Sequence, residues 1–116
     1  MSPMTTIVRV TETGPVLHIA GELDYSTAAE LRQVVTGLAL APGQRLVLDL
    51  AHLAFCDSSG ITAFIVARNH ATAAQADIAL AAVPAAVQRI LRVTGLDQVF
   101  ALEPGQDTRR GRAVGD

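Results

Sequence analysis

Residues 45–60 read RLVLDLAHLAFCDSSG, and this stretch decides the fold. Its first part, Arg45–Leu50, is a near-continuous apolar run bounded by turns, which predicts a strand that is covered on both faces. The connection 51–56 then leads into Asp57-Ser58-Ser59-Gly60, and a helix follows over about Gly60–Ala74. A buried strand that passes through a polar turn into a helix is typical of the βα units of α/β proteins.

The segments before this unit predict a hairpin and a further helix. Short β-branched runs at Ile7–Val10 and Val16–Ala20 flank a Gly-Pro turn, whereas residues 1–6 have no such pattern. A helix is expected over Thr27–Leu38, because apolar residues recur there at helical spacing. Thr27 and Glu30 have the spacing of a capping box at its start.

The segments after the unit continue the alternation of strands and helices. A strand is expected over Asp77–Val83, a helix from Pro84 until Gly95 ends it, and a last strand over Val99–Leu102. The order β-β-α-β-α-β-α-β predicts an α/β domain with a mixed, mostly parallel sheet, in which a hairpin precedes alternating strands and helices that flank the sheet. Residues 1–103 would form this single domain, and 104–116 a flexible, solvated tail with three arginines.

Composition excludes several classes of function. The 116 residues are 50% hydrophobic with a net charge of −2, and all nine basic residues are arginines. Without lysine, Schiff-base catalysis and a phosphate-loop lysine are excluded. With 3% aromatic residues and no overall basic character, nucleic-acid binding is poorly supported. No targeting segment is visible, and the apolar run Ala63–Ala67 is far shorter than the ~18 residues of a membrane span. A cytoplasmic protein that contacts no membrane is therefore expected.

The usual catalytic and metal-binding patterns are missing. His18, His52, His70 and Cys56 lack metal-ligand spacing, so neither a metal nor a cofactor is expected. The sequence has no nucleotide-binding loop and no Gly-x-Ser-x-Gly, and no histidine is placed to activate the serines. We therefore expect a protein that is not an enzyme, with a serine hydrolase as the remaining enzymatic alternative.

The segment Asp57-Ser58-Ser59-Gly60 has two interpretations. Asp and Ser are preferred residues at helix starts, so the segment could serve capping alone. Alternatively, a serine there presents its hydroxyl to solvent, and a phosphate on it would meet the positive end of the helix dipole. Asp24 ends a second acidic segment, Gly21-Glu22-Leu23-Asp24, after the preceding strand. If the two strand ends are neighbours, Asp24 and Asp57 flank the serines, although capping and turn formation would also explain both.

Two signatures resemble those of the bacterial anti-sigma factor antagonists, which are STAS-domain proteins. The first is GELDYSTAAELR at residues 21–32, and the second is LVLDL at 46–50 followed by FCDSSGI at 55–61. The resemblance covers roughly residues 5–103. Two positions depart from the family pattern. Thr62 stands where glycine is frequent, and Cys56, either a buried apolar residue or an exposed thiol, stands where a larger apolar side chain is usual.

The resemblance implies a mechanism of partner switching. The unphosphorylated protein would bind an anti-sigma factor that is also a serine kinase, and would thereby release a sigma factor. Phosphorylation of the second serine, Ser59, with Ser58 as the alternative, would break the complex, and a metal-dependent serine phosphatase would restore it. The chain would be a monomer or weak dimer. The partner surface is expected to comprise Asp24, Asp57, Ser58, Ser59, Gly60, Thr62, Arg68 and Asn69. The alternative is a STAS subunit of a larger lipid-transport or stress-signalling complex, without a phosphoswitch.

Overall fold

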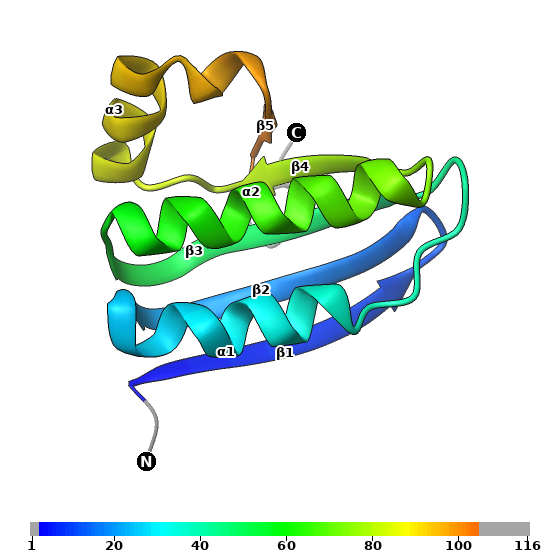
Figure 1. Ribbon diagram of the computed structural model, residues 1–116, viewed down its shortest axis with the longest axis horizontal. Coiled ribbons are helices and arrows are strands. Elements are labelled where there is room, and N and C mark those ends of the chain that lie inside the picture. Colours follow the sequence, from blue (N-terminus) through cyan, green and yellow to red (C-terminus); the bar gives the residue numbers. More distant parts are fainter. Residues whose placement is uncertain (1–2, 105–116) are drawn as a thin grey trace, which may run out of the picture.

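The computed structural model describes residues 3–104, and these form a five-stranded sheet with helices packed on it (Figure 1). The tail predicted over 104–116 lies outside the described residues, apart from Pro104. The elements are β1 (Met4–Thr11), β2 (Gly14–Leu23), α1 (Tyr25–Thr36), β3 (Arg45–Cys56), α2 (Ser58–Ala73), β4 (Asp77–Ala81), α3 (Ala85–Thr94), η1 (Leu96–Gln98) and β5 (Ala101–Glu103).

The sheet has the strand order β1-β2-β3-β4-β5. β1 pairs with β2 antiparallel, and the other three pairings are parallel. The predicted mixed, mostly parallel sheet with an initial hairpin is thus confirmed. Because β2 and β3 run in the same direction, the helices that follow them, α1 and α2, begin at the same edge of the sheet (Figure 1).

The main core lies between the helices and one face of the sheet. α1 and α2 lie side by side over this face, as Figure 1 shows, and α3 contributes Val87 and Leu91 to the same core. Alternate residues of the central strand point into it, namely Leu46, Leu48 and Leu50. All five residues 46–50 are buried, as expected for a strand covered on both faces. A smaller apolar cluster, formed by Val16, Val47, Ala79 and Ala81, lies on the opposite face.

The end of β3 differs from the prediction. Residues 51–56, expected as a connection, continue the strand as far as Cys56, because they remain paired with β2 up to Leu23↔Cys56. Several of their side chains are exposed, so this half of the strand lacks the apolar pattern of the first half. The ladder also contains register shifts, one of them between Gly21 and Glu22. Gly21 has a φ of +98°, and a Cβ there would collide with the carbonyl oxygen of Pro3.

The helix starts also differ by a few residues. α1 begins at Tyr25 rather than Thr27, and α2 at Ser58 rather than Gly60, because an aspartate caps each of them. The predicted capping box does involve Thr27, but its partner is Asp24 and not Glu30. At α3, Pro84 is the cap and Ala85 the first helical residue, and Gly95 ends the helix in the left-handed conformation as expected.

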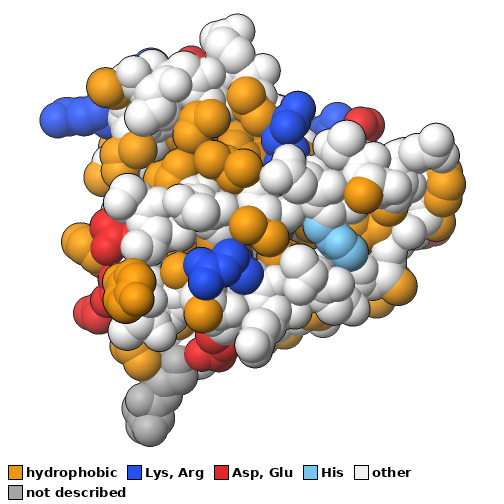
Figure 2. Space-filling model, in the orientation of Figure 1, with side chains coloured by type: hydrophobic (Ala, Val, Ile, Leu, Met, Phe, Trp, Pro, Cys, Tyr) orange, Lys and Arg blue, Asp and Glu red, His pale blue; other side chains and the backbone are white. Residues whose placement is uncertain are grey.

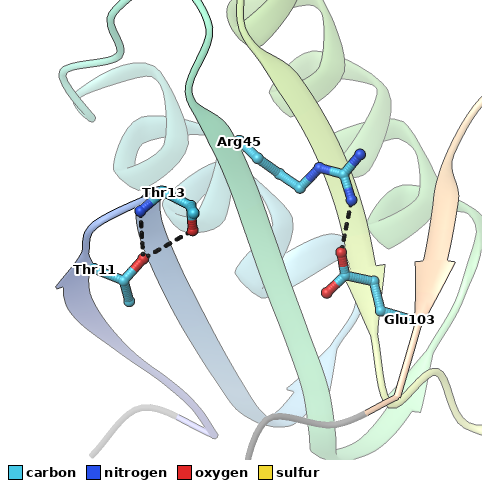
Figure 3. Close-up of polar contacts among 4 residues, drawn as sticks. All are labelled: Thr11, Thr13, Arg45 and Glu103. Carbon is cyan, nitrogen blue, oxygen red and sulfur yellow. Dashed lines mark hydrogen bonds and ion pairs between the residues drawn. The ribbon is translucent and has the colours of Figure 1, made fainter.

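Two elements end earlier than predicted, since α1 ends at Thr36 instead of Leu38 and β4 at Ala81 instead of Val83. Further differences lie at the edges of the sheet. β1 starts at Met4, within a segment expected to be loose, and η1 was not predicted. The last strand covers Ala101–Glu103 instead of Val99–Leu102. An ion pair of 2.8 Å between Arg45 Nη1 and Glu103 Oε2 ties this short strand to β3, as Figure 3 shows. The same figure shows the β1–β2 turn, where the Thr13 amide donates to Thr11 Oγ1 at 3.3 Å.

Candidate functional site

Two strand-to-helix junctions lie next to each other at one edge of the sheet. Leu23 and Cys56 are register partners at the ends of β2 and β3. The residue that follows each of them is an aspartate, Asp24 or Asp57, and each caps the next helix in extended backbone conformation. The two strand ends are therefore neighbours, which was the condition for Asp24 and Asp57 to flank the serines. The edge where parallel strands end is the usual position of binding sites in α/β sheets.

Asp24 is held by a compact set of hydrogen bonds. Its Oδ1 accepts from the Ser26 amide at 2.9 Å and from the Ser26 hydroxyl at 2.7 Å. Its own amide donates to Thr27 Oγ1 at 3.0 Å, and the buried Thr27 hydroxyl donates to the Glu22 carbonyl at 2.9 Å. The side-chain hydrogen bond from Ser26, together with backbone bonds from Ser26 and Thr27, lowers the pKa of the Asp24 carboxyl. Asp24 is therefore a fixed negative charge at neutral pH.

Asp57 caps the start of α2 by accepting hydrogen bonds from backbone amides and not from the serine hydroxyls. Its Oδ1 accepts from the amides of Ser59 at 2.9 Å and Gly60 at 3.4 Å. Ser58 is exposed and Ser59 half-buried. Within residues 3–104 neither hydroxyl makes a hydrogen bond, whereas the exposed Thr62 donates from Oγ1 to the Ser58 carbonyl at 3.1 Å. Both serine oxygens are thus available for modification without breaking an existing contact.

Gly60 allows the helix to approach β2 and β3 closely. A Cβ at this position would lie 2.7 Å from Cys56 Sγ and 2.7 Å from Leu23 Cγ. Leu23 is fully buried, so its branch point has little room to move. The half-buried thiol of Cys56 donates to the Asp57 carbonyl at 3.5 Å. Burial, and secondarily the charge of Asp57, raise the pKa of this thiol to about 12, so Cys56 is a protonated packing residue.

A groove of about 390 Å³ lies between the N-terminal parts of α1 and α2. It is lined by Tyr25, Ser26, Ala28, Ala29, Arg32, Ser59 and Thr62. Tyr25 is 87% exposed beside it. The α1 residues of this groove were not predicted as site residues, although Tyr25, Ala29 and Arg32 have the i, i+4, i+7 spacing of one helix face. That periodicity, combined with the adjacency of the two helix starts, was the signal that could have identified them.

Two of the expected surface residues lie farther along α2. Asn69 follows Thr62 by seven residues and shares its exposed stripe, about 10 Å along the helix axis. Arg68 lies on another side of the helix and lines a hollow with Arg45, Thr72 and Asp77. The structure therefore brings together Asp24, Asp57, Ser58, Ser59, Gly60 and Thr62, but it does not bring Arg68 to them.

The histidines lie apart from the serines. His70 contacts the Leu38 carbonyl through Nε2 at 2.8 Å, and His18 Nδ1 pairs with Asp49 Oδ2 at 3.1 Å on a side of β2 and β3 away from the main core. Residues 3–104 contain no group of three or more His, Cys, Asp or Glu arranged to hold a metal ion.

Over residues 3–104 no helix has both the length and the apolar character to span a membrane. A larger hollow, about 1250 Å³ and lined in part by Arg9, Thr13 and Glu103, does not include the serines.

A protein-family model described as "Mlab, STAS domain" matches residues 7–104. The chain belongs to the STAS domain family. The resemblance inferred from the two signatures is thereby confirmed. A STAS-domain containing protein of Pseudomonas aeruginosa is 29% identical over 86 residues, which cover 74% of this chain and 84% of that protein.

Solved structures share the fold of this STAS domain. An anti-sigma factor antagonist from Mycobacterium paratuberculosis superposes with a TM-score of 0.78 and 28% identity, over 97% of this chain and 95% of the other. The antagonist SpoIIAA in its unphosphorylated form gives a TM-score of 0.73 at 17% identity, over 97% and 98% of the chains. Its phosphorylated form from Bacillus gives 0.69 at 17% identity, over 94% and 99%. At 17% identity the likeness to SpoIIAA is one of fold.

Proposed function

We propose that this STAS domain is an anti-sigma factor antagonist. Its unphosphorylated form binds an anti-sigma factor that is also a serine kinase, and phosphorylation of Ser59 switches this binding off. A metal-dependent serine phosphatase reverses the modification, and the STAS domain itself catalyses no reaction. In this function it acts in the cytoplasm, as a monomer or weak dimer. Support comes from the antagonists among its structural relatives, one of them solved in a phosphorylated form.

The observation that carries the proposal is the unused Ser59 hydroxyl at a helix start already capped by Asp57. A phosphate added there leaves the cap in place, so the fold need not change. The main effect is on charge at the surface, since the net charge of the chain goes from −2 to about −4 when a phosphoserine adds roughly −1.5 to −2. The negative charges of Asp24 and Asp57 already lie at the same sheet edge. We propose that the partner contacts this edge together with Ser58, Gly60, Thr62 and the exposed stripe of α2 that leads to Asn69. Arg68 would lie at the periphery of this surface.

Charge repulsion is large enough to act as the switch. Two unit charges ~6 Å apart interact by roughly 2–3 kcal/mol at an effective dielectric constant of ~20. A doubly charged phosphate that faces one acidic group of the partner would exceed this value before screening by salt. Since each 1.4 kcal/mol changes affinity about tenfold, a loss of about 100-fold in binding is expected from repulsion alone.

The proposal is tested by binding and by mass spectrometry. With the organism's anti-sigma kinase as ligand, Ser59→Ala should bind like the unmodified chain, and Ser59→Asp should bind much more weakly. Ser58→Asp tests the alternative site, because it places the same charge on the neighbouring serine of the same surface, and it should weaken binding less than Ser59→Asp. Peptide mapping after incubation with kinase and ATP should locate one phosphate on Ser59. Equal binding of Ser59→Ala and Ser59→Asp, with no phosphate on either serine, would refute the switch.

A second function is favoured by the family model itself. Its description names Mlab and mentions no sigma factor. A STAS subunit of a larger lipid-transport or stress-signalling assembly would use the same edge of the sheet for stable docking, without phosphorylation. Stable copurification with a transport ATPase or a stress-signalling complex, unchanged by Ser59→Asp, would support this alternative over the switch.

A further inference from the structure

The groove between α1 and α2 is lined by a basic side chain, that of Arg32. Arg32, from the third turn of α1, lines the groove together with Ser59 and Thr62 of α2. Within residues 3–104, Arg32 makes no ion pair, and its backbone carbonyl accepts from the Thr36 hydroxyl at 2.8 Å. In Figure 2 basic atoms lie over the space between these two helices. The guanidinium of Arg32 is therefore available to a negative group that enters the groove.

The placement of Arg32 follows from the helix geometry. Tyr25, Ala29 and Arg32 form one stripe of α1, and Ser59 and Thr62 form the facing stripe of α2. Both helices begin at the same sheet edge and run side by side (Figure 1). Long side chains in a helix lean toward its N-terminus. This tendency favours a direction of the Arg32 side chain toward the end of the groove where Ser59 lies.

Two of the backbone amides closest to Ser59 are already engaged and are not free for a phosphate. The amides of Ser59 and Gly60 already donate to Asp57 Oδ1. Asp24 and Asp57 place negative charge at this edge, with the exposed Glu22 two residues before Asp24, and Arg32 of the groove carries a positive charge. A guanidinium offers five N–H donors in a planar fork that fits a phosphate. Arg32 is therefore the group best suited to offset the crowding of negative charge.

We propose that Arg32 holds the phosphate of phosphoserine 59 within the same chain, across the groove between α1 and α2. This inference rests on the proposed function only in taking Ser59 as the modified residue. With Arg32 drawn to the phosphate, the two groups occupy part of the groove between Tyr25 and Thr62. Phosphorylation then replaces a neutral hydroxyl and narrows the groove, and the guanidinium stabilises the doubly charged phosphate.

The test places phosphoserine at position 59 during translation, with a phosphoserine-specific tRNA, so that no kinase is needed. The second pKa of the phosphate, about 6 in a free phosphoserine, is measured by ³¹P NMR. Arg32 favours the dianion, whereas Asp24 and Asp57 oppose it and are unchanged in every variant. Arg32→Gln should therefore raise this pKa by about 0.5 unit, as expected for an exposed ion pair. Arg32→Lys, which keeps the charge, should raise it less.

Arg68→Gln is the matched control, because it removes the same charge from α2 outside the groove. A pKa that is the same in Arg32→Gln and the parent chain would overturn the proposal. An equal rise in Arg32→Gln and Arg68→Gln would also overturn it, since it would show only a distant charge effect. The measurement involves neither kinase nor anti-sigma factor. Failure of the partner switch and failure of the Arg32 contact are therefore separate results.

Discussion

The backbone amide of Asp57 donates a hydrogen bond of 3.2 Å to the carbonyl oxygen of Leu23. This bond continues the β2–β3 ladder by one residue, past the pair Leu23↔Cys56 and into the start of α2. It fixes the helix start that carries Ser59 against the strand end that leads to Asp24. The relative position of the two capping aspartates is therefore set by the backbone and does not depend on the conformation of exposed side chains.

Gly60→Ala should destabilise the domain by roughly 1–3 kcal/mol, because the added methyl overlaps Leu23 and Cys56 at 2.7 Å. The free energy of unfolding in urea measures this effect. Ser58→Ala, an exposed change in the same turn, should remain within about 0.5 kcal/mol of the parent. Equal stabilities of the Gly60→Ala variant and the parent would show that the close packing seen here is not required.

Asp57→Ala should lower the free energy of unfolding by about 1 kcal/mol, the usual cost of losing a helix cap. The Ser59 amide loses its acceptor in this variant, whereas the Gly60 amide keeps its hydrogen bond of 3.0 Å to the Asp57 backbone carbonyl. Asp57→Asn keeps an acceptor oxygen and should retain most of the stability. Urea unfolding of the three proteins at neutral pH makes the comparison, and equal losses for Ala and Asn would show that charge, not capping, is the cause.

The Asp24 carboxylate should contribute to stability in a pH-dependent way. Its pKa is lowered below the ordinary value of 3.8, chiefly by the hydrogen bond from the Ser26 hydroxyl. A lowered pKa in the folded state means that the contribution is complete above the ordinary value and is lost as pH falls through the folded value. The difference in unfolding free energy between the parent and Asp24→Asn should therefore shrink in acid. A difference that is constant with pH, or a carboxyl that titrates by NMR at its ordinary value, would contradict this.

Cys56 should be inert in the folded protein. With its pKa raised from 9.0 to about 12, the thiolate fraction at pH 8 is about 10³-fold smaller than in the unfolded chain. Reaction with a disulfide reagent should accordingly be slow until urea unfolds the domain. The raised pKa also means that the stabilising contribution is present below about pH 9 and is lost as pH rises toward 12. Cys56→Ala should lack this alkaline loss, and fast labelling of the folded parent would contradict the assignment.

The parts of the fold that were predicted correctly are those with a strong apolar period. Leu46–Leu50 and the inner face of α2 are examples, because burial there follows directly from the pattern. The errors occur where pairing or capping overrides the pattern. The second half of β3 is held by its ladder with β2 despite exposed side chains, and Asp24 extends α1 by outcompeting Thr27 as the cap.

The candidate site was predicted in part. Asp57, Ser58 and Ser59 are adjacent in the sequence, and the two signatures placed Asp24 near them. Tyr25 and Arg32 were missed because their relation to Ser59 exists only across two helices. The direction in which Arg68 points likewise depends on how α2 lies on the sheet, which a single helix does not reveal.

Because the two capping aspartates come from separate βα units, their arrangement exists only in the folded chain. A short peptide that spans residues 55–64 contains both serines, but it lacks Asp24, Arg32 and the groove. A modifying enzyme that reads the two helix starts together would therefore recognise a conformation and not a consensus sequence. Unfolded or newly made chains would then not be modified, and every phosphorylated molecule would be a folded domain.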